Sequence, residues 1–323
     1  MAGTITDVAG IRVGHATDVE AITGCTAVVF TEGARAGWAP PGFATGTRKA
    51  DVFRETHLNE TIHGLVFAGG SDYGLDAAGG AMRCLEEQRI GFDVGVSVVP
   101  IVPTAILFDL GIGDPNRRPD GQTGYQACQR ATDGVVDEGC VGAGTGATVG
   151  NLFGLDRATK TGLGIASVDS PYGPIGALAV VNAFGDVVDP DTGEILAGLR
   201  DETGDGFIST EEQIRQGVLR QGFGGRGTNT TLWVVATEVE LDRSELTRLA
   251  RMADQALVRT HSPAHGTFDG DIGIAISTRQ QPSNVDLNHI ARFAQDALMS
   301  AIRRAVTKAT SLGGVPCAAE LPS

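Results

Sequence analysis

The chain has 323 residues, of which 41% are hydrophobic and 20% are charged, so it is long enough to bury a full core as one large domain or two. Its formal net charge is −14 and it contains no cluster of basic residues. This charge argues against nucleic acids and anionic membranes as partners, because binding to either depends on Lys and Arg. A small molecule or a peptide is the expected ligand.

Short β-rich runs in the first hundred residues predict strands with glycine within or beside them. The three runs are residues 26–30, 65–68 and 94–99. Between the last two, a helix is expected to begin near Ser71, since serine often caps helices. Its buried face is expected to hold the apolar residues at helical spacing, which are Leu75, Ala78, Met82 and Leu85.

The second half of the chain predicts further strands over residues 162–168, 177–184, 232–240 and 272–277. A helix is expected to begin at Asp242, because Glu245 three residues later completes a capping box. Another helix is expected over residues 285–305, with one apolar stripe. The residues after 229 therefore alternate strand, helix, strand, helix.

The segment 189–220 is polar and predicts an exposed loop. Within it, Asp201, Asp205, Gly206 and Glu212 stand at positions one, five, six and twelve of a calcium-binding loop. Position three is Thr203, which is neither Asp nor Asn, and the helix expected after the loop is weak. We favour a solvated acidic loop, and a non-enzymatic calcium-responsive protein is the alternative.

The five cysteines are odd in number and none forms a Cys-x-x-Cys pair, so neither a disulfide framework nor a zinc site is indicated. No apolar run reaches the length of about 18 residues that a membrane span needs. The first residues also lack a basic region followed by an apolar one. These features predict a cytoplasmic protein with reduced thiols.

Two further patterns are weak. The run 142–150 contains an approximate Gly-x-Gly-x-x-Ala, but it lacks a strand-to-helix unit with a ribose-binding acid about 20 residues on. Close backbone packing explains these glycines. His261 and His265 are four residues apart, but a helix that held both would have to pass through Pro263. We expect no metal and no cofactor.

The run Gly-Thr-Asn-Thr-Thr at residues 227–231 immediately precedes the apolar stretch 232–236. A threonine hydroxyl needs a base to become a nucleophile, and a free α-amine with a pKa of about 8 can supply one. Cleavage between Asn229 and Thr230 would give Thr230 such an amine. The alternatives are a polar turn before a strand, or an N-glycosylation sequon at Asn229.

Seven segments in this order resemble a known family of N-terminal-nucleophile hydrolases. That family includes L-aminopeptidase/D-Ala-esterase, the β-peptidyl aminopeptidases and the nylon-oligomer endo-hydrolase. The segments are residues 10–15, 23–26, 69–76, 142–150, 160–164, 229–231 and 268–271. Each is weak alone, but the ordered set is specific. The resemblance implies an α+β fold, an αββα sandwich, in a single domain over residues 1–323. Self-cleavage would divide it into an α chain of residues 1–229 and a β chain of residues 230–323.

The resemblance also implies roles for individual residues. Thr230 matches the nucleophile, and Lys160 matches a lysine beside it whose charge would lower the pKa of the freed amine. Asn182 matches a donor to the oxyanion. Asp269 and Asp271 match an acidic pair that orients the threonine, and alternation along an extended segment would place both carboxylates on one face. Without the resemblance, a surface lysine, a structural asparagine and an Asp-Gly turn are the alternatives.

Phe108 departs from the family pattern. Several relatives have a tyrosine there that donates to the oxyanion or the substrate. Phe108 is thus a candidate substrate contact that lacks the hydroxyl, and the nearby Tyr125 need not replace it.

The expected function is a self-processing amidohydrolase or peptidase that needs no cofactor. Its substrates would be small peptides, aminoacyl amides or linear amide oligomers. The resemblance also implies a homo-oligomer of αβ heterodimers. The alternative is an acyltransferase resembling ornithine acetyltransferase, which the segments 69–71 and 268–271 count against.

Overall fold

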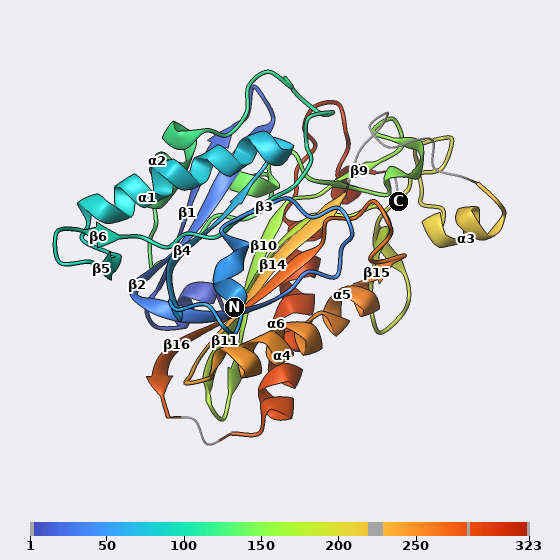
Figure 1. Cartoon of the computed structure of the whole chain (residues 1–323). Coiled ribbons are helices and arrows are strands. Elements are labelled where there is room, and N and C mark those ends of the chain that lie inside the picture. Colours follow the sequence, from blue (N-terminus) through green and yellow to red (C-terminus); the bar gives the residue numbers. More distant parts are fainter. Residues whose placement is uncertain (1–2, 219–228, 283–284, 322–323) are drawn as a thin grey trace.

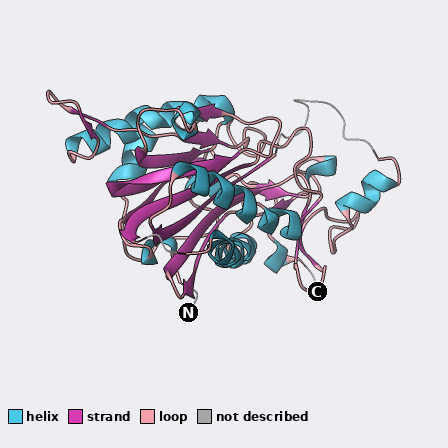
Figure 2. Ribbon diagram, turned by 60° about the horizontal axis from the view of Figure 1, so that its bottom comes forward, coloured by secondary structure: helices cyan, strands magenta, loops and turns pink. Residues whose placement is uncertain are grey.

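The structure is a computed structural model that describes residues 3–218, 229–282 and 285–321 (Figure 1). Two layers of β-sheet lie between two layers of helices (Figure 2). This is the αββα sandwich of the α+β class that the resemblance implied.

The two sheet layers share a long strand, β2 (Thr23–Ala39). The first half of β2 pairs with β1, residues between 25 and 35 pair with β4, and the last five residues pair with β16. The strand order is β10-β11-β14-β16-β2-β4-β7-β3, with β1 beside β2. The other strands of this sheet are β1 (Ile11–Asp18), β3 (Thr47–Arg48), β4 (Thr61–Ala68), β7 (Thr104–Ile106), β10 (Leu163–Ser170), β11 (Gly173–Asn182), β14 (Thr230–Val239) and β16 (Ile272–Gln281).

The helices cover the outer faces of the two layers (Figure 1). On one side lie α1 (Ala77–Glu87) and α2 (Gly121–Gln129), and on the other α4 (Arg243–Ala253), α5 (Gln255–Thr260) and α6 (Leu287–Thr307). A short helix, α3 (Thr210–Arg215), lies apart from them. The remaining short strands are β5 (Phe92–Asp93), β6 (Val98–Val99), β8 (Thr148–Val149), β9 (Thr159–Lys160), β12 (Asp186–Val188), β13 (Ile195–Ala197) and β15 (His261–Ser262).

The core is divided according to the alternation of side chains along each strand. In β14, Leu232 and Val234 belong to the central core between the sheet layers. Trp233 and Val235 belong to the core beneath α4 and α6. Both faces of the strand are buried, which explains why its sequence is a continuous apolar run.

The parallel pair β14 and β16 positions the site. Leu232 lies opposite Ile272, so the two strands start at the same end of the sheet. β11 runs antiparallel to β14, and its last residue, Asn182, lies opposite Thr230. The ends of three neighbouring strands therefore meet around Thr230.

Both helices predicted after residue 240 are confirmed. The Asp242 carboxylate accepts the backbone N–H of Glu245 at 2.7 Å, and the Glu245 carboxylate accepts that of Asp242 at 2.8 Å. This is the predicted capping box. In α6, the apolar stripe from Ile290 to Ile302 is buried against β10 and β11.

Three predictions about elements need correction. Residues 94–99 do not form one strand: β5 and β6 make a hairpin whose turn holds Gly95 at a φ of +83°, and Val96 is 94% exposed. The helix expected from Ser71 begins as a 3-10 turn, Ser71–Asp76, and α1 starts at Ala77. The polar segment after residue 189 is not all loop, because it contains β13 and α3.

Hydrogen bonds within the chain order the acidic loop, and close backbone packing accounts for the glycine-rich run. The Asp201 carboxylate accepts the backbone N–H groups of Gly204 and Asp205 and the hydroxyl of Thr203. In the described part of the chain, no group of three or more His, Cys, Asp or Glu residues is arranged to hold a metal.

In the glycine-rich run, a β-carbon on Gly144 would lie 2.5 Å from the backbone nitrogen of Leu163, as close packing requires. None of the helices described here is long and apolar enough to cross a membrane.

Candidate active site

The peptide bond between Asn229 and Thr230 is buried at the start of β14. The Asn229 carbonyl accepts the backbone N–H of Gly270 at 2.8 Å. Both residues are at most 4% exposed. A β-carbon on Gly270 would lie 2.7 Å from the Thr230 hydroxyl oxygen, so only glycine allows this hydroxyl to approach so closely. The Thr230 hydroxyl therefore lies directly over the Asp-Gly-Asp segment.

The two aspartates of that segment contact different parts of the chain. Asp271 accepts the backbone N–H of Thr231, the residue after Thr230, at 2.6 Å. Asp269 accepts the backbone N–H of Gly266 at 2.5 Å. Both side chains are buried. The structure thus brings Asp269 and Asp271 to the start of β14, and Asp271 is hydrogen-bonded directly to that strand.

Asn182 faces Thr230 from the neighbouring strand, and both ends of its amide are engaged. Its oxygen accepts the backbone N–H of Thr148 at 3.0 Å, and its nitrogen donates to the Phe108 carbonyl at 3.1 Å. The amide nitrogen carries two N–H groups, so one remains for another acceptor. The Phe108 contact also places that residue beside the site, through its backbone.

Lys160 is fully buried in β9, so the surface-lysine alternative is wrong. Its ammonium donates to the carbonyls of Ala147 at 2.8 Å and Thr161 at 2.5 Å, with a longer contact to that of Gly144 at 3.4 Å. Burial lowers the pKa of Lys160, and the interaction with Cys140 and, less strongly, the charge of Asp109 oppose this shift. Among the described residues its hydrogen-bond partners are these backbone carbonyls and the Cys140 side chain, and Thr230 is not one of them. It reaches the site through its strand, since Thr148, its partner in β8, donates to Asn182.

Asp109 was missed by the sequence reasoning. It is 5% exposed and accepts the Thr23 hydroxyl and the Gly70 backbone N–H, both at 2.7 Å. Burial raises the pKa of Asp109 to about 6 against these hydrogen bonds. A β-carbon on Gly146 would lie 2.4 Å from that of Asp109. Three of the segments that carry the family resemblance therefore converge on this carboxylate, which follows Phe108 in the chain. A lone acid after the apolar run 105–108 was the available signal.

His265 and His261 were dismissed as metal ligands, and the structure gives them other contacts. The Nδ1 atom of His265 contacts Asp271 at 2.9 Å, and its Nε2 atom forms an ion pair with Asp254 at 3.0 Å. His261 lies 3.4 Å from the Thr231 hydroxyl and 3.0 Å from that of Thr260. Burial lowers the pKa of His261 to about 4. Only the contact of His265 with Asp271 reaches the acidic pair.

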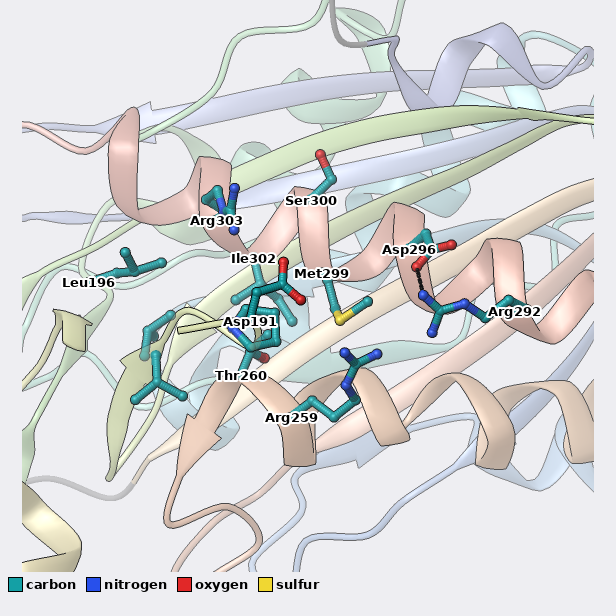
Figure 3. Close-up of a pocket in the computed structure, with 13 residues that line it drawn as sticks. Asp191, Leu196, Arg259, Thr260, Arg292, Asp296, Met299, Ser300, Ile302 and Arg303 are labelled. Atoms are coloured by element: carbon teal, nitrogen blue, oxygen red, sulfur yellow. Dashed lines mark ion pairs between the residues drawn. The ribbon is translucent and has the colours of Figure 1, made fainter. Parts of the chain in front are cut away.

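Two cavities differ in their relation to this cluster. A cavity of about 240 Å³ lies between α5, α6 and the segment that includes β12, and Arg292 and Asp296 form an ion pair in its wall (Figure 3). None of the residues around Thr230 lines it. A second cavity, of about 190 Å³, includes Asp269. Its apolar wall consists of Leu152, Phe184, Ile214, Val218 and Phe268.

Comparison with solved structures shows where this fold occurs. A β-aminopeptidase of Burkholderia sp. superimposes with a TM-score of 0.71 at 20% identity, covering 99% of this chain and 93% of that one. An L-aminopeptidase D-Ala-esterase/amidase of Ochrobactrum anthropi, described as a variant of the N-terminal-nucleophile hydrolase fold, has a TM-score of 0.69 at 21% identity. That alignment covers 98% of this chain and 90% of the other. The fold implied by the sequence is confirmed.

Sequence comparison identifies the family. An uncharacterised aminopeptidase of Mycobacterium tuberculosis is 38% identical over 352 residues, covering 97% of this chain and 96% of the relative. A 6-aminohexanoate-oligomer endohydrolase of Kocuria sp. is 29% identical over 281 residues, covering 84% of this chain and 74% of the relative. The model of peptidase family S58 matches residues 3–317. These matches favour hydrolysis over the acyl transfer considered as an alternative. The protein belongs to peptidase family S58 and is an enzyme that hydrolyses amide bonds.

Proposed function

We propose that the protein is made as a single-domain precursor of residues 1–323 that cleaves itself between Asn229 and Thr230. The observation that carries the proposal is the Thr230 hydroxyl, buried at the start of an interior strand, over Gly270 and opposite Asn182. In the precursor, this hydroxyl attacks the Asn229 carbonyl carbon. The peptide nitrogen leaves and becomes the α-amine of Thr230. Water then hydrolyses the resulting ester and releases the Asn229 carboxylate.

In turnover the same hydroxyl attacks the carbonyl of a substrate amide. The α-amine of Thr230 takes the hydroxyl proton and passes it to the leaving nitrogen, and water hydrolyses the acyl ester. The free N–H of the Asn182 amide donates to the oxyanion, a contribution of about 3 kcal/mol to lowering the barrier. The buried Lys160 adds positive charge that favours the neutral amine. Asp269 and Asp271 orient the first residues of β14.

The substrates are small peptides, aminoacyl amides or linear amide oligomers. The relatives named above include aminopeptidases and an oligomer endohydrolase, which supports this class. The apolar wall beside Asp269 gives the hydrocarbon part of such a substrate a surface to pack against. At Phe108, the substrate meets no tyrosine hydroxyl. We also propose a homo-oligomer of αβ units in the cytoplasm, where the five unpaired cysteines would stay reduced.

Denaturing mass spectrometry and an amide-hydrolysis assay test the proposal together. The wild type is expected to give two fragments divided at Asn229/Thr230. Thr230→Ala is expected to stay intact and to lose at least about a thousandfold in kcat/KM toward aminoacyl p-nitroanilides and 6-aminohexanoate oligomers. Thr192→Ala, in an exposed turn, serves as the matched control and should be processed normally. An intact wild type that still hydrolyses amides, with Thr230→Ala equally active, would overturn the proposal.

A further inference from the structure

A histidine bridges two aspartates behind the start of β14. Asp254 lies between α4 and α5, His265 lies in the segment between β15 and β16, and Asp271 immediately precedes β16. The imidazole contacts Asp254 through Nε2 at 3.0 Å and Asp271 through Nδ1 at 2.9 Å. The other oxygen of Asp271 accepts the backbone N–H of Thr231 at 2.6 Å. A continuous set of contacts thus runs from Asp254 to the residue after Thr230.

The backbone at His265 is shaped for this contact. Its φ is +54°, in the left-handed region that non-glycine residues rarely adopt, although asparagine, aspartate and histidine adopt it more often than the others. Non-glycine residues hold such a conformation where surrounding contacts impose it, and they concentrate at functional sites. Here the two ends of the imidazole ring supply those contacts.

The charges around the ring favour imidazolium. Burial alone would lower the pKa of His265, but contact with Asp254 and Asp271 outweighs it and raises the pKa to about 10. His261, from β15, also faces this group, but burial and the charge of His265 lower the pKa of His261 to about 4 and keep it neutral. A protonated imidazole carries a proton on both nitrogens: Nδ1 hydrogen-bonds to Asp271, whereas Nε2 forms an ion pair with Asp254 without hydrogen-bond geometry.

We propose that His265 is a positioning residue for the hydrolytic reaction: it fixes the Asp271 carboxylate against the Thr231 N–H and so aligns Thr230 for attack. This inference rests on the proposed function, because it takes Thr230 as the nucleophile. His265 itself does not touch the reacting atoms. Its effect is therefore expected on the rate of the bound complex, kcat, and much less on KM.

Two substitutions distinguish the contact that Nδ1 makes from the contact that Nε2 makes. Asparagine places a nitrogen where His265 has Nδ1, and glutamine places one where it has Nε2. His265→Asn therefore keeps a donor for Asp271 and suits the positive φ, whereas His265→Gln keeps only the contact with Asp254. A third variant, His265→Gly, removes both contacts without backbone strain. The exposed His289, which stacks on Tyr172, provides the control His289→Gln.

Each rate is divided by the fraction of cleaved chain, measured by denaturing mass spectrometry. We expect His265→Asn and His289→Gln to keep kcat within about threefold of the wild type. His265→Gln and His265→Gly should each lose at least about tenfold in kcat, with KM changed by less than about threefold. Folding of each variant is checked by its thermal unfolding midpoint, and the glycine variant alone suffices if the glutamine variant does not fold.

The outcomes separate this inference from the proposed function. If Thr230→Ala is inactive while His265→Gly and His265→Gln retain wild-type kcat, the role of His265 is wrong and Thr230 remains the nucleophile. Equal losses in the asparagine and glycine variants would also overturn it, because the Asp271 contact would then not be the deciding one. If Thr230→Ala is fully active, the proposed function fails first.

Discussion

At the scale of single residues, the buried charges near Thr230 are held in different ways. The Lys160 ammonium donates hydrogen bonds to backbone carbonyls, whereas the Asp109 carboxylate accepts hydrogen bonds from a hydroxyl and a backbone N–H. The charge on His265 is balanced by carboxylates on both sides. A buried charge without such partners costs several kcal/mol, so each of these contacts is needed for the charged form to persist.

The pKa shifts of two histidines predict how the unfolding free energy changes with pH. In the folded protein the pKa of His265 is raised from its ordinary 6.5 to about 10, so the proton it binds stabilises the fold fully below pH 6.5. That stabilisation is lost as pH rises toward about 10.

The difference in unfolding free energy between the wild type and His265→Asn should therefore be largest at or below pH 6.5 and should shrink up to pH 10, as measured by urea unfolding.

His261 predicts the opposite sign at acid pH. Its pKa is lowered from 6.5 to about 4, so its contribution is complete above pH 6.5 and falls as the pH drops toward 4. A difference between the wild type and His265→Asn that stays constant from pH 6 to pH 10 would contradict the assigned charge of His265.

At the scale of elements, the pair β14 and β16 depends on one small residue. Trp233 of β14 lies opposite Gly273 of β16, and its ring covers that glycine. A β-carbon on Gly273 would lie 1.8 Å from the ring of Trp233, which is fully buried. Protein cores are packed densely, so the indole has no adjoining space into which to move.

Gly273→Ala is therefore expected to lower the unfolding free energy by about 1–3 kcal/mol through overpacking. The matched control is Gly79→Ala in α1, where a β-carbon meets nothing within 4 Å. That variant should gain roughly 0.5–1 kcal/mol, because alanine favours a helix more than glycine does. Urea unfolding of both variants measures the two effects, and similar values for them would refute this account of the packing.

The elements also show what the sequence could reveal. The capping box at Asp242 and the stripe of α6 were predictable, because both depend on residues three or four positions apart. The hairpin of β5 and β6 was not, since its valines resemble a buried strand, whereas Val94, Val96 and Val99 are exposed. The contacts of Asp109 and His265 could not be predicted from the sequence either. Asp109 meets Thr23 across 86 positions, and periodicity does not report contacts at such separations.

At the scale of the whole molecule, the division proposed at residue 229 would run through the centre of the sheet. β14 and β16 come from residues 230–323, whereas their outer neighbours β11 and β2 come from residues 1–229. Both cores beside these strands combine side chains from the two parts. The two parts therefore share two hydrophobic cores, and apolar burial in these cores stabilises both parts.

Cleavage is thus expected to leave one particle. The wild type and uncleaved Thr230→Ala should elute at the same volume in native size-exclusion chromatography, and both fragments of the wild type should be found in that peak. Separation is expected only in denaturant. A fragment of residues 230–323 that elutes alone in native buffer would contradict this arrangement of the sheet.

The pairing of Thr230 with Asn182 has one more consequence. Chain termini are usually the least ordered part of a protein, and fixing one residue costs about 1–2 kcal/mol of conformational entropy. Here the newly formed end would be the first residue of β14, a strand that is hydrogen-bonded to neighbours on both sides. The conformational entropy of this end would then be lost once, when the precursor folds, before any substrate arrives. Each later turnover would begin from an end group that is already immobilised.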